Sequence, residues 1–224
     1  MTTIVHLENV RYALGGQAIF EDLQLDLSAG KFIALLGENG TGKTTLMRII
    51  SGLAKQVRGI RQVPELGQIS YVPDLHAYEN SKIKDVLLDY QWLFTNFSKE
   101  RADELLAFMQ LTPNTTVRSL SKGNLEKLTL VLTLARDAEL YLLDEPLSGV
   151  DIGSRKKIIN ALLQWVPETG TVLISTHHVN EMSAILDEAI VLKDGEVMRH
   201  VETEAVREQG LSLIDVYQQV YGEV

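Results

Sequence analysis

The amino-acid sequence predicts an α/β fold, in which a parallel β-sheet is covered by helices on both faces. Two observations support this class. Residues 31–36 (KFIALL) are continuously apolar after the first residue, as in a strand buried on both faces. From residue 140 onward, short apolar segments alternate with segments of helical periodicity, and such alternation is how parallel strands are connected.

The N-terminal part of the chain is rich in predicted strands. Residues 23–27 alternate apolar and polar side chains, which is the period of a half-exposed strand, and residues 28–30 (SAG) turn the chain. A glycine-rich segment over 37–42 precedes a helix that closes near Gly52. The elements expected in this part are strands over 4–10, 23–27, 31–36 and 69–72, the last halted by Pro73, and a helix over 43–53.

The central part of the chain breaks the alternation. Residues 81–110 carry Leu, Val, Phe and Trp at spacings of three and four, and Pro113 with the polar run 114–116 ends this helical pattern. We interpret 76–118 as a helical subdomain inserted into a core made of 1–75 and 119–224, all within one domain. A single sheet with long helical connections is the alternative. The aromatics expected in the core of the helical block are Trp92, Phe94, Phe97 and Phe108.

The second half of the chain returns to alternating elements. Its apolar runs are short enough for strands, and each is followed by a longer amphipathic segment. The elements expected here are helices over 125–136, 155–165 and 179–186 and strands over 140–143, 171–175 and 189–192.

Length and composition exclude several classes. With 224 residues, 45% of them hydrophobic, the chain can bury a sizeable core. It has no cysteine, so disulfides, thiolate metal sites and cysteine nucleophiles are excluded. A formal net charge of −9 disfavours non-specific binding to nucleic acid. We find no signal peptide and no apolar run near the roughly 18–20 residues of a membrane span.

A complete phosphate-binding motif follows the buried strand. Residues 37–44 (GENGTGKT) match G-x-x-x-x-G-K-[ST] between a predicted strand and a predicted helix. The glycines let backbone N–H groups surround a phosphate, and the helix N-terminus adds positive charge. Lys43 is expected to reach the β- and γ-phosphates of a nucleotide, and Thr44 to place its hydroxyl on Mg²⁺. A plain glycine turn is the alternative, against which the full motif argues.

A pair of carboxylates ends a later strand. A phosphate loop needs an acidic residue at the end of another core strand to complete the Mg²⁺ site. Asp144 and Glu145 follow the apolar run 140–143 and meet this need. Asp144 is expected to hold Mg²⁺ through water, and Glu145 to orient and deprotonate the attacking water. The alternative is a solvated acidic strand end.

Three further segments, after or near the carboxylate pair and the phosphate loop, resemble the motifs of one protein family. Residues 120–124 (LSKGN), followed by a helix and the Asp-Glu strand, resemble the signature of ABC-transporter ATPases, usually Leu-Ser-Gly-Gly-Gln. Residues 148–151 (SGVD) are similar to the family's D-loop, and residues 175–177 (STH) to its switch-histidine loop. Tyr12 stands where the family has its adenine-stacking aromatic. The resemblance covers about residues 4–200, in the family's order.

The resemblance implies a P-loop NTPase core with a parallel sheet, an N-terminal antiparallel β subdomain and an inserted helical subdomain. It implies an ATPase with ATP and Mg²⁺ as cofactors. The ATP-binding residues would be Tyr12, Gly37, Asn39, Gly40, Thr41, Gly42, Lys43, Thr44, Thr45, Ser121, Gly123 and Asn124. The catalytic residues would be Glu145, His177 and Lys43, and the Mg²⁺ ligands Thr44, Asp144 and Asp74.

The sequence departs from the family pattern in two places. The signature loop carries Lys122 and Asn124 where Gly and Gln are usual, while Ser121 and Gly123 are retained. The Q-loop position holds Asp74 instead of glutamine. A carboxylate can ligate Mg²⁺, which prefers oxygen, but it donates no hydrogen bond unless protonated.

The resemblance also implies partners. One ATP would lie between the phosphate loop of one copy and the signature loop of another, so a two-fold dimer completes two sites. Asp151 would cross this interface or cap the following helix, and Tyr12 would stack on adenine or pack at the surface. His76 and Tyr78 lie where the family receives a helix of the membrane subunit, with loop packing as the alternative.

The sequence thus predicts an ATP-hydrolysing subunit at the cytoplasmic face of the cell membrane, paired with a second ATPase copy and a transmembrane permease. The Leu-Ser-Lys-Gly form of the signature and the compact size of the chain resemble those of ATPases from small exporters for drugs or peptides. Importer ATPases share every catalytic motif, so import is the alternative. The rivals are a soluble ABC ATPase acting on nucleic acid or ribosomes, a P-loop kinase, and a nucleotide-gated scaffold without hydrolysis. The separation of Lys43 from Ser121 leaves no room for a long coiled coil.

Overall fold

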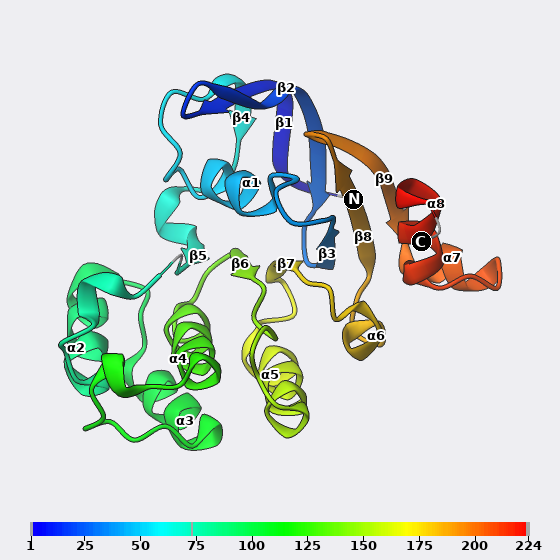
Figure 1. Cartoon of the computed structure of the whole chain (residues 1–224). Coiled ribbons are helices and arrows are strands. Elements are labelled where there is room, and N and C mark those ends of the chain that lie inside the picture. The colour runs from blue at the N-terminus through cyan, green and yellow to red at the C-terminus, as the bar shows by residue number, and fades with distance from the viewer. Residues whose placement is uncertain (1, 73, 223–224) are drawn as a thin grey trace.

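The computed structural model describes residues 2–72 and 74–222, so Pro73 lies outside the described residues. Two sheets and a set of helices build the molecule (Figure 1). A small antiparallel sheet and α1 lie on one side of a larger mixed sheet, and α4, α5 and α6 lie on the other side. The predicted α/β class is therefore confirmed.

The small sheet has the order β2-β1-β4, and both of its pairings are antiparallel. Val5, Leu7 and Leu25 are buried in it, while the residues between them are more exposed, so the polar–apolar alternation of the sequence sets which face meets the core. The antiparallel N-terminal sheet implied by the family resemblance is therefore confirmed. Its strands are β1 (Thr3–Leu14), β2 (Gln17–Ser28) and β4 (Arg58–Gln62).

The large sheet has the order β5-β6-β7-β3-β8-β9. The first five strands in this order are parallel, and β9 is antiparallel to β8. The carboxyl ends of β3, β6 and β7 therefore lie side by side at one edge. The strands are β3 (Phe32–Leu36), β5 (Ile69–Tyr71), β6 (Leu140–Asp144), β7 (Thr171–Ser175), β8 (Glu188–Lys193) and β9 (Glu196–Glu202).

The central strand β3 is buried on both faces. Ile33 and Leu35 pack into one core with α1 and the small sheet. Ala34 and Leu36 pack into a second core with α4, α5 and other helices. All four side chains are at most 1% exposed. One face is thus covered by a single helix together with the antiparallel sheet, and the other face by helices, because strand side chains alternate between faces.

The helices lie close to their predicted positions, with some differences in length. The pattern over 81–110 forms two helices separated by residues 94–98, and the helix predicted over 179–186 spans only four residues. The α-helices are α1 (Lys43–Ile50), α2 (Ile83–Leu93), α3 (Lys99–Met109), α4 (Lys122–Leu134), α5 (Ile152–Trp165), α6 (Val179–Met182), α7 (Thr203–Glu208) and α8 (Leu213–Tyr221). Short 3₁₀ helices cover Leu66–Gln68, His76–Tyr78 and Val117–Ser119.

The helices α2 and α3 pack against each other and against α4. Phe97 is buried, and Phe94 and Phe108 are partly buried against the same core, as expected. The prediction for Trp92 is wrong, because this side chain is 85% exposed on the outer face of α2. Whether 76–118 folds as a separate unit stays a prediction.

Sequence analysis missed β4, β9, α7 and α8. For β9 a signal was available, because Asp194 and Gly195 both adopt positive φ at the β8–β9 turn, and Asp-Gly is a strong hairpin signal. β4 carries two arginines and a glutamine in five residues, so no apolar alternation marks it. None of the described helices is both long and apolar enough to cross a membrane.

Candidate functional site

The phosphate loop, the carboxylate pair and His177 gather at the carboxyl edge of the large sheet. The loop over 37–42 follows β3, Asp144 and Glu145 end β6, and His177 follows β7. Because β6, β7 and β3 are neighbours in the sheet, the topology brings these three segments together. In open α/β sheets this edge is where ligands bind.

The loop 37–42 folds around the ammonium group of Lys43. Lys43 Nζ donates hydrogen bonds to the carbonyl oxygens of Gly37 at 2.7 Å and Glu38 at 2.9 Å. The side chain is buried, and burial lowers the pKa of Lys43, while the charges of Glu145 and Asp144 oppose this shift. A buried cation held beside two carboxylates is well placed to meet the negative charge of a phosphate.

The N-terminus of α1 opens into this loop. Gly42 is the N-cap with φ of 104°, and no side chain caps the helix, which leaves its first N–H groups for a ligand. A side chain at Gly42 would lie 2.8 Å from Phe20, so only glycine fits there. Asn39 and Gly40 are exposed at the tip of the loop, and Thr41 closes it through a 2.9 Å hydrogen bond from Oγ1 to the Glu38 carbonyl.

Asp144 is held by two hydroxyl groups. Thr44 Oγ1 donates to Asp144 Oδ2 at 2.6 Å, and Ser175 Oγ donates to Asp144 Oδ1 at 2.6 Å. Thr44 stands in the first turn of α1, with Thr45 next to it, and Ser175 ends β7. The ends of β6 and β7 and the first turn of α1 therefore meet at one carboxylate. A hydroxyl and a carboxylate oxygen in contact are the kind of oxygen ligands that Mg²⁺ takes.

Glu145 has different surroundings. Its backbone has φ of 51°, which is uncommon for a residue other than glycine, and its N–H donates to Ser175 at Oγ (2.9 Å) and O (3.1 Å). Neither carboxylate oxygen accepts a hydrogen bond from the described residues, although both are buried. Burial raises the pKa of Glu145, and His177 and Lys43 oppose this shift. A buried, unsatisfied carboxylate of raised basicity has the properties of a general base.

His177 and His178 have separate environments. His177 Nδ1 lies 3.0 Å from Glu145 Oε1, and its side chain is half exposed. The His178 ring contacts Arg155 at 3.2 Å and Glu181 at 3.3 Å, and burial and Arg155 lower the pKa of His178. His178 also precedes the first residue of α6. The structure therefore places His177, and not His178, beside Glu145.

The signature loop does not join the phosphate loop within the chain. Ser121 caps α4 by accepting the Asn124 N–H at 3.3 Å, and Lys122 Nζ donates to Ser148 Oγ at 3.1 Å. A side chain at Gly123 would lie 3.0 Å from the Gly149 carbonyl, so the loop packs closely on 148–150. Among the described residues no hydrogen bond joins Ser121, Gly123 or Asn124 to residues 37–45.

Asp151 has the capping geometry that sequence analysis kept as one alternative. Its Oδ1 accepts the Ser154 N–H at 3.0 Å at the start of α5, and the side chain and backbone of Ser154 together lower the pKa of Asp151. Arg155, one turn later, donates to the Val150 carbonyl at 2.9 Å and to Glu181 at 2.6 Å. Arg155 thus connects the loop 148–151 to the segment that follows His177.

Tyr12 lies at the mouth of a cavity on the small sheet. It pairs with Phe20 across β1 and β2, and Phe20 in turn contacts Gly42 of the phosphate loop. The cavity, about 990 Å³, is lined by Tyr12, Phe20 and the arginines Arg11 and Arg58 among others. Tyr12 is half-exposed, so its ring face is accessible to a flat ligand group.

Asp74 and Asp144 line the same cavity of about 480 Å³. Asp74 is exposed, and its Oδ1 accepts the His76 N–H at 3.1 Å. His76 pairs with Glu79 at 2.9 Å and is exposed, while Tyr78 packs partly against the helical core. A third carboxylate, Glu126 of α4, lines this cavity too, and burial raises the pKa of Glu126 to about 7.

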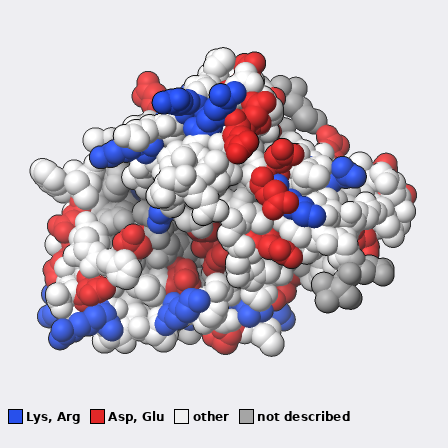
Figure 2. All heavy atoms as spheres, turned by 45° about the horizontal axis from the view of Figure 1, so that its top comes forward, with Lys and Arg blue, Asp and Glu red and all other residues white. Residues whose placement is uncertain are grey.

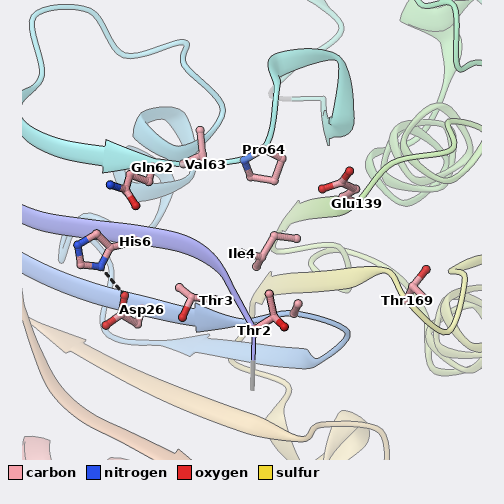
Figure 3. Close-up of a pocket in the computed structure, with 11 residues that line it drawn as sticks. Thr2, Thr3, Ile4, His6, Asp26, Gln62, Val63, Pro64, Glu139 and Thr169 are labelled. Carbon is pink, nitrogen blue, oxygen red and sulfur yellow. Dashed lines mark hydrogen bonds and ion pairs between the residues drawn. The ribbon is translucent and has the colours of Figure 1, made fainter.

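A further cavity, of about 920 Å³, lies at the opposite edge of the sheet (Figure 3). His6 pairs with Asp26 at 2.6 Å on its wall, and Glu139 and Thr169 line it just before β6 and β7 begin. None of the predicted site residues lines this cavity. The carboxyl edge therefore remains the candidate site.

The family of the chain follows from comparison with known proteins. The family model of the ABC transporter matches residues 20–148, which contain the phosphate loop, the signature loop and the carboxylate pair. The chain belongs to the ABC transporter family. It is an ATP-binding subunit of this family, and the family implies ATP hydrolysis.

Relatives of this ABC transporter subunit cover nearly all of it. An aliphatic sulfonates import ATP-binding protein of Pseudomonas savastanoi pv. phaseolicola is 34% identical over 213 residues, 93% of this chain and 78% of that protein. An uncharacterized ABC transporter ATP-binding protein of Methanocaldococcus jannaschii is 26% identical over 208 residues, 90% of this chain and 79% of that protein.

Solved structures share the fold. An ATP-binding subunit of an ABC transporter has a TM-score of 0.85 at 22% identity, with 98% of this chain and 100% of that chain covered. A nucleotide-free ATP-binding cassette of an ABC transporter has a TM-score of 0.75 at 19% identity, covering 93% and 94%. These similarities show the fold of the ABC ATPase subunit.

Sequence analysis missed three side chains of this ABC ATPase site. Ser175 ends an otherwise apolar strand at the edge where Asp144 lies, and this position was a signal for its contact with Asp144. Glu126 precedes Lys127 in the polar first half of α4, and only the structure shows that it lines a cavity with Asp144. Tyr221 hydrogen-bonds the phosphate loop from the C-terminal helix, and no motif marks it.

The raised pKa of Glu126 predicts a pH-dependent cost to stability. The folded protein retains a proton that the unfolded chain releases near 4.5, so wild-type stability falls as pH rises from about 4.5 to about 7. Asp144 and Glu145 add to this shift, and Lys122 opposes it. In Glu126→Gln this loss is absent, so the urea midpoint of the variant relative to wild type should rise between pH 5 and pH 8, measured with EDTA. A constant difference across this range would contradict the prediction.

Proposed function

We propose that this chain is the Mg²⁺-dependent, ATP-hydrolysing subunit of an ABC transporter, and that it works as a dimer on a separate membrane permease. The observation that carries the hydrolytic part is the contrast within one carboxylate pair. Asp144 is bound by two hydroxyls, whereas the oxygens of Glu145 are buried and accept no hydrogen bond from the described residues. The first arrangement suits a metal ligand and the second a general base.

The residues present fit ATP with Mg²⁺. The uncapped N-terminus of α1 and the ammonium of Lys43 would hold the β- and γ-phosphates, and Tyr12 would stack on the base. Thr44 and Asp144 would hold Mg²⁺, and Asp74 lines the same cavity as Asp144. Bound Mg²⁺ supplies positive charge that stabilises the phosphates.

The chain's own side chains divide the remaining work. Glu145 takes a proton from water, because burial raises its pKa and its Oε2 accepts no hydrogen bond from the described residues. His177 contacts Oε1 of Glu145 at 3.0 Å and holds this carboxylate in place. Lys43 keeps its charge beside both carboxylates and offers it to the phosphates.

Glu145→Gln tests the base. The amide cannot accept the proton, so steady-state ATPase activity should fall roughly 10²- to 10⁴-fold while ATP binding is retained. Glu139→Gln is a matched control, since Glu139 is exposed at the opposite end of the same strand. Near-normal hydrolysis by Glu145→Gln in a coupled phosphate-release assay would move the base role to another residue.

The dimer is supported by the position of the signature loop. The signature loop contacts residues 148–150 and the start of α4 of its own chain. These contacts do not include the phosphate loop of the same chain. A second copy related by a two-fold axis would bring its signature loop to this phosphate loop, and the exchange would complete both sites. Homodimer and heterodimer are equally compatible with this arrangement.

Ser121→Arg tests the shared site. The arginine should block the phosphate site of the facing copy without touching its own phosphate loop, so ATPase activity should fall to background while the monomer still binds ATP. Ser119→Arg adds the same side chain at an exposed position two residues earlier and should retain activity. Loss of ATP binding by monomeric Ser121→Arg in calorimetry would show that the site is not shared.

Asp74 tests the metal site. A carboxylate there helps hold a divalent cation but repels the γ-phosphate, so the two effects oppose each other. Asp74→Ala should lower ATPase activity a few fold and shift its Mg²⁺ dependence to higher concentration, while Asp74→Gln should preserve or raise the rate. Asp89→Ala, an exposed site on α2, is the control. Superimposable Mg²⁺ curves for wild type and both Asp74 variants would leave Asp74 as a loop residue.

The transport role places the subunit at the cytoplasmic face of the cell membrane through its permease. The exposed His76 and the partly buried Tyr78 are the expected contact for that partner. The Leu-Ser-Lys-Gly form of the signature loop favours export of a drug or peptide. The relatives named as aliphatic sulfonates import proteins favour import.

Purification of the tagged subunit from native membranes tests the transport role and its direction. Recovery with a permease and a substrate-binding protein would assign import, and recovery with a permease alone would assign export. Recovery with ribosomes or nucleic acid would contradict the transporter role. Against that rival, acidic and basic side chains are interspersed on the face in Figure 2, without a continuous basic surface there.

A further inference from the structure

The C-terminal helix α8 reaches the phosphate loop, although it lies outside the segment that matches the family model. The Tyr221 hydroxyl donates to the Leu192 carbonyl at 2.5 Å and accepts the N–H of Glu38 at 3.2 Å. Glu38 is the second residue of the phosphate loop, and Leu192 lies near the end of β8. One hydroxyl therefore bridges the loop to the neighbouring strand.

The hydroxyl stands where the ladder between β3 and β8 ends. These strands are parallel neighbours, and their last pair joins Leu36 to Val191. Beyond this pair, the chain continues to Glu38 after β3 and to Leu192 in β8. The Tyr221 hydroxyl connects these two residues where a further hydrogen bond of the sheet would lie. A side chain at Gly37 would lie 2.5 Å from the Leu192 carbonyl, so the loop already approaches this carbonyl as closely as glycine allows.

The Tyr221 ring is itself held in place. It stacks on the Tyr217 ring with centroids 4.6 Å apart, and Lys193 Nζ lies over the Tyr221 ring at 5.2 Å from its centroid. Lys193 Nζ also donates to the Val220 carbonyl at 3.1 Å. Burial raises the pKa of Tyr221, which keeps the hydroxyl protonated and able to donate.

The same helix faces the reacting end of the candidate site. A cavity of about 560 Å³ lies between α8, the phosphate loop and the segment after β7. Tyr217 and Tyr221 line it from α8, Glu38 and Asn39 from the phosphate loop, and His177 from the third side. A movement of α8 would therefore displace the phosphate loop before it affected the cavity of Tyr12, where the base of the nucleotide is proposed to lie.

We propose that α8 is a positioning element for the phosphate loop, and that Tyr221 acts through the Glu38 amide to hold the loop in its phosphate-binding shape. This inference rests on the proposed ATP-binding role of that loop. Tyr221 touches no phosphate in this scheme, so it is a positioning residue. It sets the affinity for nucleotide and leaves the chemistry of Glu145 unchanged.

Tyr221→Phe is the test, because it keeps the ring and removes one oxygen. Loss of a hydrogen bond to the loop should weaken binding of fluorescent ADP about three- to tenfold. The KM for ATP should rise by the same factor while kcat stays at the wild-type value, since only binding is affected. The Glu38 amide should exchange hydrogen about tenfold faster in the variant.

Tyr217→Phe is the matched control, since it loses a hydroxyl on the same helix that makes no hydrogen bond with the described residues. It should bind ADP as wild type does. Equal weakening by both variants would show that α8 acts through packing alone and would overturn the role of the Tyr221 hydroxyl. Unchanged ADP affinity in Tyr221→Phe would overturn it as well.

Two further outcomes keep the proposals separable. If wild-type protein binds no fluorescent ADP, the proposed function fails, whatever the variants do. If Tyr221→Phe does not fold, hydrogen exchange of the wild-type protein decides. A Glu38 amide that exchanges as fast as the exposed Asn39 amide would then overturn the inference, and a protected amide would support it.

Discussion

Burial of β3 on both faces is the constraint on which the rest of the structure depends. Its four inner side chains contact two separate cores, one with α1 and the small sheet and one with the helical layer. A strand so enclosed must leave the sheet at a single point, between its neighbours β7 and β8. The glycine-rich loop begins at that exit. The position of the loop is therefore set by β3, whose four inner side chains are at most 1% exposed. A loop that must surround a phosphate closely gains its precision from this rigid support.

Two adjacent carboxylates acquire different chemistry from their surroundings alone. Asp144 ends the regular part of β6 and receives hydroxyl groups from α1 and β7, because those elements end at the same edge. Glu145 is the next residue, but its positive φ turns the chain. Its carboxylate oxygens are buried beside the His177 ring and accept no hydrogen bond from the described residues. Burial without hydrogen bonds raises basicity, whereas hydroxyl contacts stabilise the charged form. The strained backbone at Glu145 is therefore part of what separates the two roles.

The sequence predicted the strands of the parallel core well, because continuous apolar runs of four to six residues bounded by turn residues leave few alternatives. It also put the phosphate loop, Asp144 and His177 after three predicted strands, and the strand order that brings these ends to one edge came from the structure. It failed where packing decides. Trp92 has the spacing of a core residue but faces outward, because α2 buries its Ile83, Val86 and Leu87 face instead. The contact of Tyr221 depends on how α8 folds back, and no local pattern carries that information.

The contacts of the signature loop form a chain of interactions that reaches the segment 177–181 within one chain. Lys122 and Gly123 touch the segment 148–150, and Arg155 then binds the Val150 carbonyl and Glu181. Glu181 also contacts His178, the neighbour of the histidine that touches Glu145. A second copy that presses on the signature loop would therefore act on a network that ends beside the proposed base of the same chain. In the proposed dimer each chain would present its signature loop to one site and its Glu145 to the other, so this network would link the two sites.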